Sequence, residues 1–150
     1  MKSIIVTGGL GFIGSNLISL LLKKKFQVLN IDKVTYASNF FNTLEFKKNK
    51  KYNFIKCELN NEKKLKNIIK NFKPDGIFNI AAETHVDRSI DGPKNFVYSN
   101  IIGTFNLLEI IRKYKINTKL IHISTDEVYG DKLFGRSKEE DAYRPSSPYA

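Results

Sequence analysis

The stretch that decides the fold is Thr7-Gly8-Gly9-Leu10-Gly11-Phe12-Ile13-Gly14. It follows a short β-branched run, Ser3–Thr7, and leads into Phe12–Lys24, where apolar residues recur at helical spacing. Glycine lets the backbone turn tightly and approach a pyrophosphate, and the start of a helix offers free N–H groups to the same anion. The order of strand, glycine turn and helix therefore predicts a dinucleotide-binding site that includes Gly8, Gly11 and Gly14.

An acidic residue follows at the distance that such a site requires. Asp32 comes directly after a second predicted strand, Gln27–Ile31, and lies roughly 20 residues beyond the glycine turn. A carboxylate there can accept hydrogen bonds from the adenosine ribose hydroxyls and would repel a 2′-phosphate, so Asp32 favours NAD over NADP. Lys33 is an adjacent cation that could tolerate that phosphate. The simpler interpretation, a glycine turn beside a solvated aspartate, leaves the order of these elements unexplained.

Strand and helix patterns alternate along the rest of the chain. We predict strands at Tyr52–Lys56, Gly76–Ile80 and Lys119–Ser124, and helices at Glu62–Asn71 and Pro93–Tyr114. Such alternation indicates an α/β fold, a doubly wound parallel sheet of the Rossmann type. Ligands of these sheets bind at the carboxyl ends of the strands, where each motif discussed here falls. Residues 1–150 are thus expected to form one NAD-binding domain.

Composition and charge exclude several other classes of protein. Hydrophobic residues make up 41% of the chain, which is ordinary for a globular protein, and no apolar run reaches the roughly 18–20 residues of a membrane span. The net charge of +10 rests mainly on lysines at positions expected to be solvated, without aromatic stacking motifs. We therefore expect no nucleic-acid or membrane partner and no metal site. The lack of a signal-peptide pattern and the single cysteine, Cys57, fit a cytoplasmic protein.

Gly8, Gly11 and Gly14 have the spacing Gly-x-x-Gly-x-x-Gly, which resembles that of the extended short-chain dehydrogenase/reductase superfamily. Further stretches resemble one family of this superfamily, the dTDP-glucose 4,6-dehydratases. They are Asn30–Ala37, Ala81–Ile90, Ser99–Thr104, Ser124–Asp131 and Pro145–Tyr149. The last of these is similar to the approach to the Tyr-x-x-x-Lys motif of the superfamily. The resemblance covers the N-terminal part of the family and almost the whole chain. The chain ends at Ala150, inside that motif and before the region that binds the nucleotide-sugar in this family.

The resemblance implies that NAD is the cofactor. Phe12 and Ile13 would lie beside its pyrophosphate, and Glu58 stands where the family usually has an aspartate near the adenine. Ser99 replaces the usual threonine, and Thr84 the usual serine. The full set of implied cofactor contacts comprises Gly8, Gly11, Phe12, Ile13, Gly14, Asp32, Lys33, Val34, Thr35, Glu58, Leu59, Ala81, Ala82, Glu83 and Ser99.

The same resemblance implies the chemistry. Thr84 and Thr125 would contact a nucleotide-sugar substrate, Asp126 would be the acid and Glu127 the base, and Tyr149 would deprotonate the sugar hydroxyl. The implied lyase reaction converts dTDP-glucose to dTDP-4-keto-6-deoxyglucose by internal hydride transfer, a step of deoxysugar biosynthesis. An adjacent acid and base at the end of a strand suits the elimination of water, which needs two proton movements. The full-length enzyme is expected to be a homodimer.

Two alternatives stay open at this point. An epimerase, dehydratase or decarboxylase acting on a UDP- or GDP-sugar would share the cofactor motifs, although a simple epimerase has no water to eliminate. A non-catalytic NAD-binding fragment is the second alternative, because the sequence ends before the lysine of the motif. We accordingly expect the 150-residue chain alone to be inactive.

Overall fold

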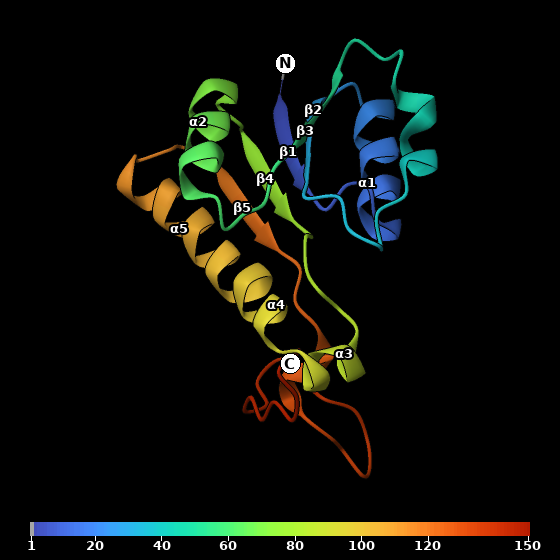
Figure 1. The fold of residues 1–150 in the computed structure, drawn as a ribbon, viewed down its shortest axis with the longest axis vertical. Helices are drawn as coiled ribbons and strands as arrows, with labels where there is room; N and C mark the ends of the chain where they lie inside the picture. The colour runs from blue at the N-terminus through green and yellow to red at the C-terminus, as the bar shows by residue number, and fades with distance from the viewer. Residues whose placement is uncertain (1) are drawn as a thin grey trace.

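A single parallel sheet organises the chain, whose computed structural model describes residues 2–150. The sheet order is β3-β2-β1-β4-β5, in which all neighbouring strands are parallel. All carboxyl ends therefore meet at one edge, and the C-terminus of the chain lies beyond this edge (Figure 1). The predicted doubly wound parallel sheet is confirmed. The strands are β1 (Ser3–Thr7), β2 (Gln27–Asp32), β3 (Tyr52–Lys56), β4 (Gly76–Asn79) and β5 (Lys119–His122).

Helices cover both faces of the sheet. Helix α1 (Phe12–Lys23) and the 3-10 helix η1 (Phe40–Phe46) pack on one face, and α2 (Glu62–Phe72) and α5 (Gly103–Lys113) pack on the other (Figure 1). Side chains alternate along a strand, so Val6 joins the core under α1 while its neighbour Ile5 joins the core under α2 and α5. Burying one such side chain contributes about 1.5–3 kcal/mol, which is why strands covered on both faces carry continuous apolar runs.

The structure corrects several predicted boundaries. The helix predicted at Pro93–Tyr114 consists of α4 (Lys94–Phe96), a π-helical segment η2 (Val97–Ile102) and α5, and Pro93 lies at its N-cap. The segment after β4, predicted as a loop, contains helix α3 (Val86–Asp91). Strands β4 and β5 end at Asn79 and His122, earlier than predicted, and helix η1 was not predicted at all.

Lysines gather where the helices end, at the amino edge of the sheet. Lys25, Lys73 and Lys115 follow α1, α2 and α5, and each has a positive φ, of 65°, 50° and 48°. A helix C-terminus carries partial negative charge, which a nearby cation offsets. Part of the basic charge of the chain therefore has a structural role on the edge opposite the strand carboxyl ends. No helix within residues 2–150 is long and apolar enough to cross a membrane.

Candidate functional site

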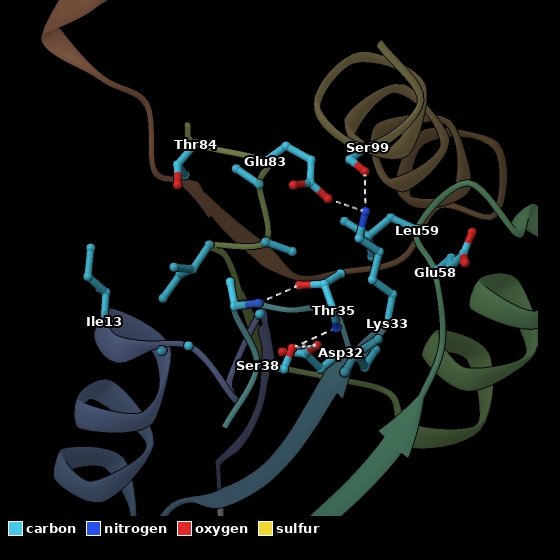
Figure 2. A pocket seen from close by; sticks show the side chains of 18 of the residues that line it. Ile13, Asp32, Lys33, Thr35, Ser38, Glu58, Leu59, Glu83, Thr84 and Ser99 are labelled. Atoms are coloured by element: carbon cyan, nitrogen blue, oxygen red, sulfur yellow. Dashed lines mark hydrogen bonds and ion pairs between the residues drawn. The ribbon is translucent and has the colours of Figure 1, made fainter. Parts of the chain in front are cut away.

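A cavity of about 400 Å³ opens at the carboxyl edge, between the segments that follow β1, β2, β3 and β4 (Figure 2). Every cofactor contact expected from the sequence lines it except Val34, and so does Thr84, which was expected to contact the substrate. Its volume lies in the range of about 300–1,000 Å³ that is typical of small-molecule sites. Lining residues that were not expected are Ile31, Tyr36, Ala37, Ser38, Cys57, Asn60 and Ile80.

Glycines allow the close contacts at the floor of the cavity. Gly8 has a φ of +71°, and a Cβ placed on it would lie 2.8 Å from the Cα of Ala81 in the segment after β4. A Cβ on Gly14 would lie 2.3 Å from the carbonyl oxygen of Gly8. The N-cap residue of α1 is Gly11, which has no side chain to accept a hydrogen bond from the first turn of the helix. The first N–H groups of this helix thus remain available to an anion in the cavity.

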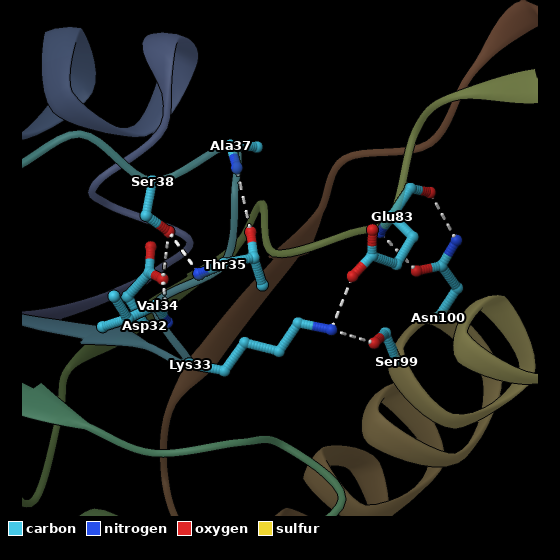
Figure 3. Close-up of polar contacts among 9 residues, drawn as sticks. All are labelled: Asp32, Lys33, Val34, Thr35, Ala37, Ser38, Glu83, Ser99 and Asn100. Carbon is cyan, nitrogen blue, oxygen red and sulfur yellow. Dashed lines mark hydrogen bonds and ion pairs between the residues drawn. The ribbon is translucent and has the colours of Figure 1, made fainter. Parts of the chain in front are cut away.

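Asp32 connects the glycine turn to the segment after β2, a role that sequence reasoning did not predict. One carboxylate oxygen accepts the backbone N–H of Leu10 (3.1 Å). The other accepts the N–H of Val34 (2.8 Å) and the hydroxyl of Ser38 (3.0 Å), as Figure 3 shows. A carboxylate offers about four acceptor positions, so Asp32 can accept one more hydrogen bond. Val34 does not line the cavity, but its N–H helps to hold the Asp32 carboxylate. Its φ of 63° is strained for a β-branched residue.

Asn30 is a second residue that sequence reasoning missed. It lies fully buried in β2, where its side-chain oxygen accepts the N–H of Gly9 (3.0 Å) and its amide donates to the hydroxyl of Tyr52 (3.0 Å). A buried amide must be hydrogen-bonded to offset the loss of water. A polar residue inside an apolar strand is the signal that could have identified it. Its hydrogen bond to Gly9 holds the glycine turn against strand β2.

Lys33 has partners that the sequence did not suggest. Its ammonium donates to the Glu83 carboxylate at 2.6 Å and to the Ser99 hydroxyl at 2.7 Å (Figure 3). The adjacent Asn100 makes two hydrogen bonds with the backbone of Glu83, both of 2.9 Å. Lys33, the cation next to Asp32, is therefore part of a link between three segments.

Two of the expected catalytic residues, Asp126 and Glu127, lie in the segment after β5, outside the lining of this cavity. Thr125 caps the 3-10 helix η3 (Asp126–Tyr129) by accepting the N–H of Glu127 (3.3 Å), and its hydroxyl contacts Asp126 at 3.4 Å. Asp126 is exposed and Glu127 is half-buried. The structure thus brings Thr125, Asp126 and Glu127 together at the end of a strand.

Tyr149 lies against the helices that follow β4. Its N–H donates to the hydroxyl of Ser89 on α3 (3.2 Å), and its ring packs edge-on against Phe96, with 6.5 Å between the ring centres. Ser89 is fully buried and Phe96 is nearly so. These contacts attach the end of the described chain to the segment that carries Thr84.

Burial raises the pKa of the Cys57 thiol, which keeps it protonated and unreactive at neutral pH. Across residues 2–150, no group of three or more His, Cys, Asp or Glu side chains is placed to hold a metal ion.

The fold and the cavity define a class of protein. A parallel sheet with a glycine turn after β1, a buried acid at the end of β2 and a cavity between them is a Rossmann-type dinucleotide-binding domain. The family model described as GDP-mannose 4,6 dehydratase matches residues 5–150, and the chain belongs to this family.

Named relatives narrow the resemblance. The dTDP-glucose 4,6-dehydratase of Haemophilus influenzae is 43% identical over 100% of this chain and 48% of its own length, and that of Salmonella typhimurium is 41% identical over 98% of the chain and 46% of its own length. These findings confirm the family resemblance inferred from the sequence. The chain spans about half the length of the curated relatives it matches.

Solved structures agree with this assignment. The dTDP-glucose 4,6-dehydratase of Bacillus anthracis in complex with NAD has a TM-score of 0.86 at 39% identity, and covers 99% of this chain with 46% of its own. The Streptomyces venezuelae enzyme of the same name, also with NAD bound, has a TM-score of 0.91 at 34% identity over 99% of this chain and 47% of its own. A UDP-glucose 4-epimerase of Thermus thermophilus in complex with NAD has a TM-score of 0.86 at 30% identity, covering 99% and 46%.

Proposed function

We propose that this chain is the cofactor-binding part of an NAD-dependent dTDP-glucose 4,6-dehydratase, a lyase that acts on a nucleotide-sugar. The observation that carries the proposal is the cavity at the carboxyl edge, with the glycine turn on one side and Asp32 on another. The relatives bearing that name, at about 40% identity, support the choice of substrate. The Asp126–Glu127 pair after β5 favours a dehydratase over an epimerase, which eliminates no water.

The residues of the cavity fit NAD. The uncapped first turn of α1 would face the pyrophosphate. Gly8 lies against the backbone of Ala81 and has no side chain, so the pyrophosphate could approach its backbone closely. The remaining acceptor position of Asp32 would take a ribose hydroxyl, and Glu58 and Leu59 after β3 would lie near the adenine. When bound, NAD would accept a hydride from the sugar and later return it.

The side chains of the chain would move the protons. Tyr149 would take the proton of the C4 hydroxyl as the carbonyl forms at C4. That carbonyl acidifies the hydrogen at C5, which Glu127 would remove, while Asp126 would protonate the departing C6 hydroxyl as water leaves. Two residues are needed because the proton leaves carbon at one atom and is delivered to oxygen at another. Thr84 and Thr125 would hold the sugar through their hydroxyls.

The test of this function uses the full-length protein and dTDP-glucose labelled with deuterium at C4. The expected product is a 4-keto-6-deoxy sugar with the deuterium at C6, because the hydride returns within the same molecule. Formation of dTDP-galactose, or faster turnover of a UDP- or GDP-sugar, would contradict the proposal. The 150-residue chain alone is expected to yield no product, since it spans about half of its relatives.

We also propose that the full-length enzyme is a cytoplasmic homodimer. The helical stretch from η2 to α5 carries four exposed apolar side chains, Val97, Ile101, Phe105 and Leu108. Their spacing of four, four and three residues places them on one helix face, and exposed apolar patches of this kind mark interfaces. Sedimentation velocity on the full-length protein tests this: Phe105→Lys should yield monomers, and an unchanged dimer would place the interface elsewhere.

The proposed cytoplasmic location is supported by Cys57, which is buried and forms no disulfide, as is usual in a reducing compartment.

A further inference from the structure

A three-membered cross-link spans the adenosine side of the cavity. Lys33 follows β2, Glu83 lies in the segment after β4, and Ser99 belongs to η2. The lysine ammonium contacts both other side chains at 2.6 and 2.7 Å (Figure 3). All three residues also line the cavity. The side chains of Lys33 and Glu83 are only 30% and 12% exposed, so water screens this pair less than it would a surface pair.

The segment η2 holds Glu83 from a second direction. Asn100, next to Ser99, donates to the Glu83 carbonyl and accepts its N–H. Ser99 and Asn100 are consecutive residues of a π-helical turn, in which Ser99 contacts Lys33 and Asn100 contacts the backbone of Glu83. Such turns are often found at functional sites. The backbone of Glu83 is thus held by Asn100, and its carboxylate pairs with the Lys33 ammonium.

The position of Lys33 matters for cofactor choice. It follows Asp32, whose carboxylate lies where the adenosine ribose is expected. NADP differs from NAD by a phosphate on that ribose, and a free ammonium one residue away is suited to bind it. An ammonium with two short bonds to Glu83 and Ser99 has only one donor left. That remaining donor would have to meet the phosphate beside the Glu83 carboxylate, whose negative charge repels a phosphate.

We propose that Glu83 determines cofactor selectivity by holding Lys33 away from the 2′-phosphate of NADP. Asp32 supplies repulsion, and the cross-link removes the one adjacent cation that would offset it. Glu83 is then a specificity-determining residue that acts through Lys33, from a segment 50 residues away. This inference rests on the proposed use of the cavity for NAD.

The test compares the dissociation constants of NAD and NADP by calorimetry. In Glu83→Gln, Lys33 loses its anionic partner, and the preference for NAD over NADP should fall by about tenfold, as expected for one charge-assisted hydrogen bond gained by the phosphate. The double variant Lys33→Met with Glu83→Gln should regain most of the wild-type preference, because the freed cation is gone. Glu45→Gln, an exposed residue of η1, is the charge-matched control and should change neither constant.

A single variant tests the idea even if Glu83→Gln does not fold. Lys33→Met alone should weaken NADP binding no more than NAD binding, because Lys33 does not reach the phosphate while Glu83 is present. A selective loss of NADP affinity in this variant would overturn the proposal, and so would an unchanged preference in Glu83→Gln. A wild-type chain that is folded but binds no NAD would instead contradict the proposed function.

Discussion

The proposed cofactor side of the carboxyl edge, formed by the segments after β1 and β2, and the proposed catalytic side, formed by the segment after β5, differ in how deeply their residues are buried. Around β1 and β2, the buried side chains of Asn30 and Asp32 hold the glycine turn by hydrogen bonds to Gly9 and Leu10. By contrast, no residue from Lys119 to Ala150 is buried. Leu133 and Phe134, in the segment after η3, are 91% and 92% exposed.

This difference separates binding from chemistry. A ligand site is effective when its groups are held before the ligand arrives, since less ordering is then lost on binding. The cofactor side meets this condition within the chain, whereas Asp126 and Leu133 still face solvent. We therefore expect changes on the cofactor side to alter folding and NAD affinity together, and changes on the catalytic side to leave NAD affinity unchanged.

The largest expected effect falls on the catalytic side. In the full-length protein, Asp126→Asn and Glu127→Gln should each slow dehydration by about 10²–10⁴-fold, because each removes one proton transfer. NAD affinity should remain as in the wild type, since neither side chain lines the cavity. Single-turnover kinetics that follow NADH absorbance and loss of the C5 hydrogen separately would measure this. Elimination at the wild-type rate in both variants would show that Asp126 and Glu127 form a solvated turn with no catalytic role.

The next effect falls on the cofactor side. Gly14→Ala should weaken NAD binding on the order of 100-fold and lower the free energy of unfolding by about 2–4 kcal/mol, because the new Cβ meets the Gly8 carbonyl at 2.3 Å. Calorimetry and urea unfolding measure the two quantities.

Gly135→Ala is the matched control from the catalytic side. Gly135 has a φ of +81° but no atom within 4 Å of its would-be Cβ, so the substitution should cost only about 1 kcal/mol and leave NAD affinity unchanged. If Gly14→Ala were as mild as this control, the glycine turn would not be the tightly packed floor described above.

The smallest effect concerns the amino edge, far from both sides of the comparison. Ser3 donates its N–H (2.7 Å) and its hydroxyl (2.9 Å) to Asp75, and these bonds lower the pKa of Asp75 below its usual value. A carboxyl with a lower pKa in the folded state stabilises the protein above its unfolded-state pKa, and this contribution is lost as the pH falls through the folded-state pKa. Asp75→Asn should thus be slightly less stable at neutral pH.

Urea unfolding at several pH values checks this prediction. The gap between Asp75→Asn and the wild type should close in acid, while NAD affinity at neutral pH stays the same in both. A gap that persists in acid, after Asp75 is protonated, would show that the effect is not due to its charge.

Local pattern could predict the strands and the glycine turn, because hydrophobic period and turn residues are properties of neighbouring positions. The 3-10 helix η1 escaped prediction, since it is a run of short turns capped by Asn39 rather than a periodic helix. Likewise, α3 has only six residues, too few for a helical period to be visible.

The candidate site shows the same division. Asp32 follows from its distance to the glycine turn, but its bonds to Leu10 and Ser38 depend on how two loops fold. The pairing of Lys33 with Glu83 joins residues 50 positions apart, and charge alone does not select one partner among many lysines and acids. Such partners become visible only when the sheet places the loops side by side.

Titration of the 150-residue chain with NAD and NADP by calorimetry tests the central claim most directly, namely that the cavity at the carboxyl edge binds NAD. With folding verified by circular dichroism, we predict that NAD binds and that it binds more tightly than NADP, because the Asp32 carboxylate would accept a hydrogen bond from the adenosine ribose and Lys33 is paired with Glu83. NADP binding that equals or exceeds NAD binding, or no binding of NAD to the folded chain, would contradict the account.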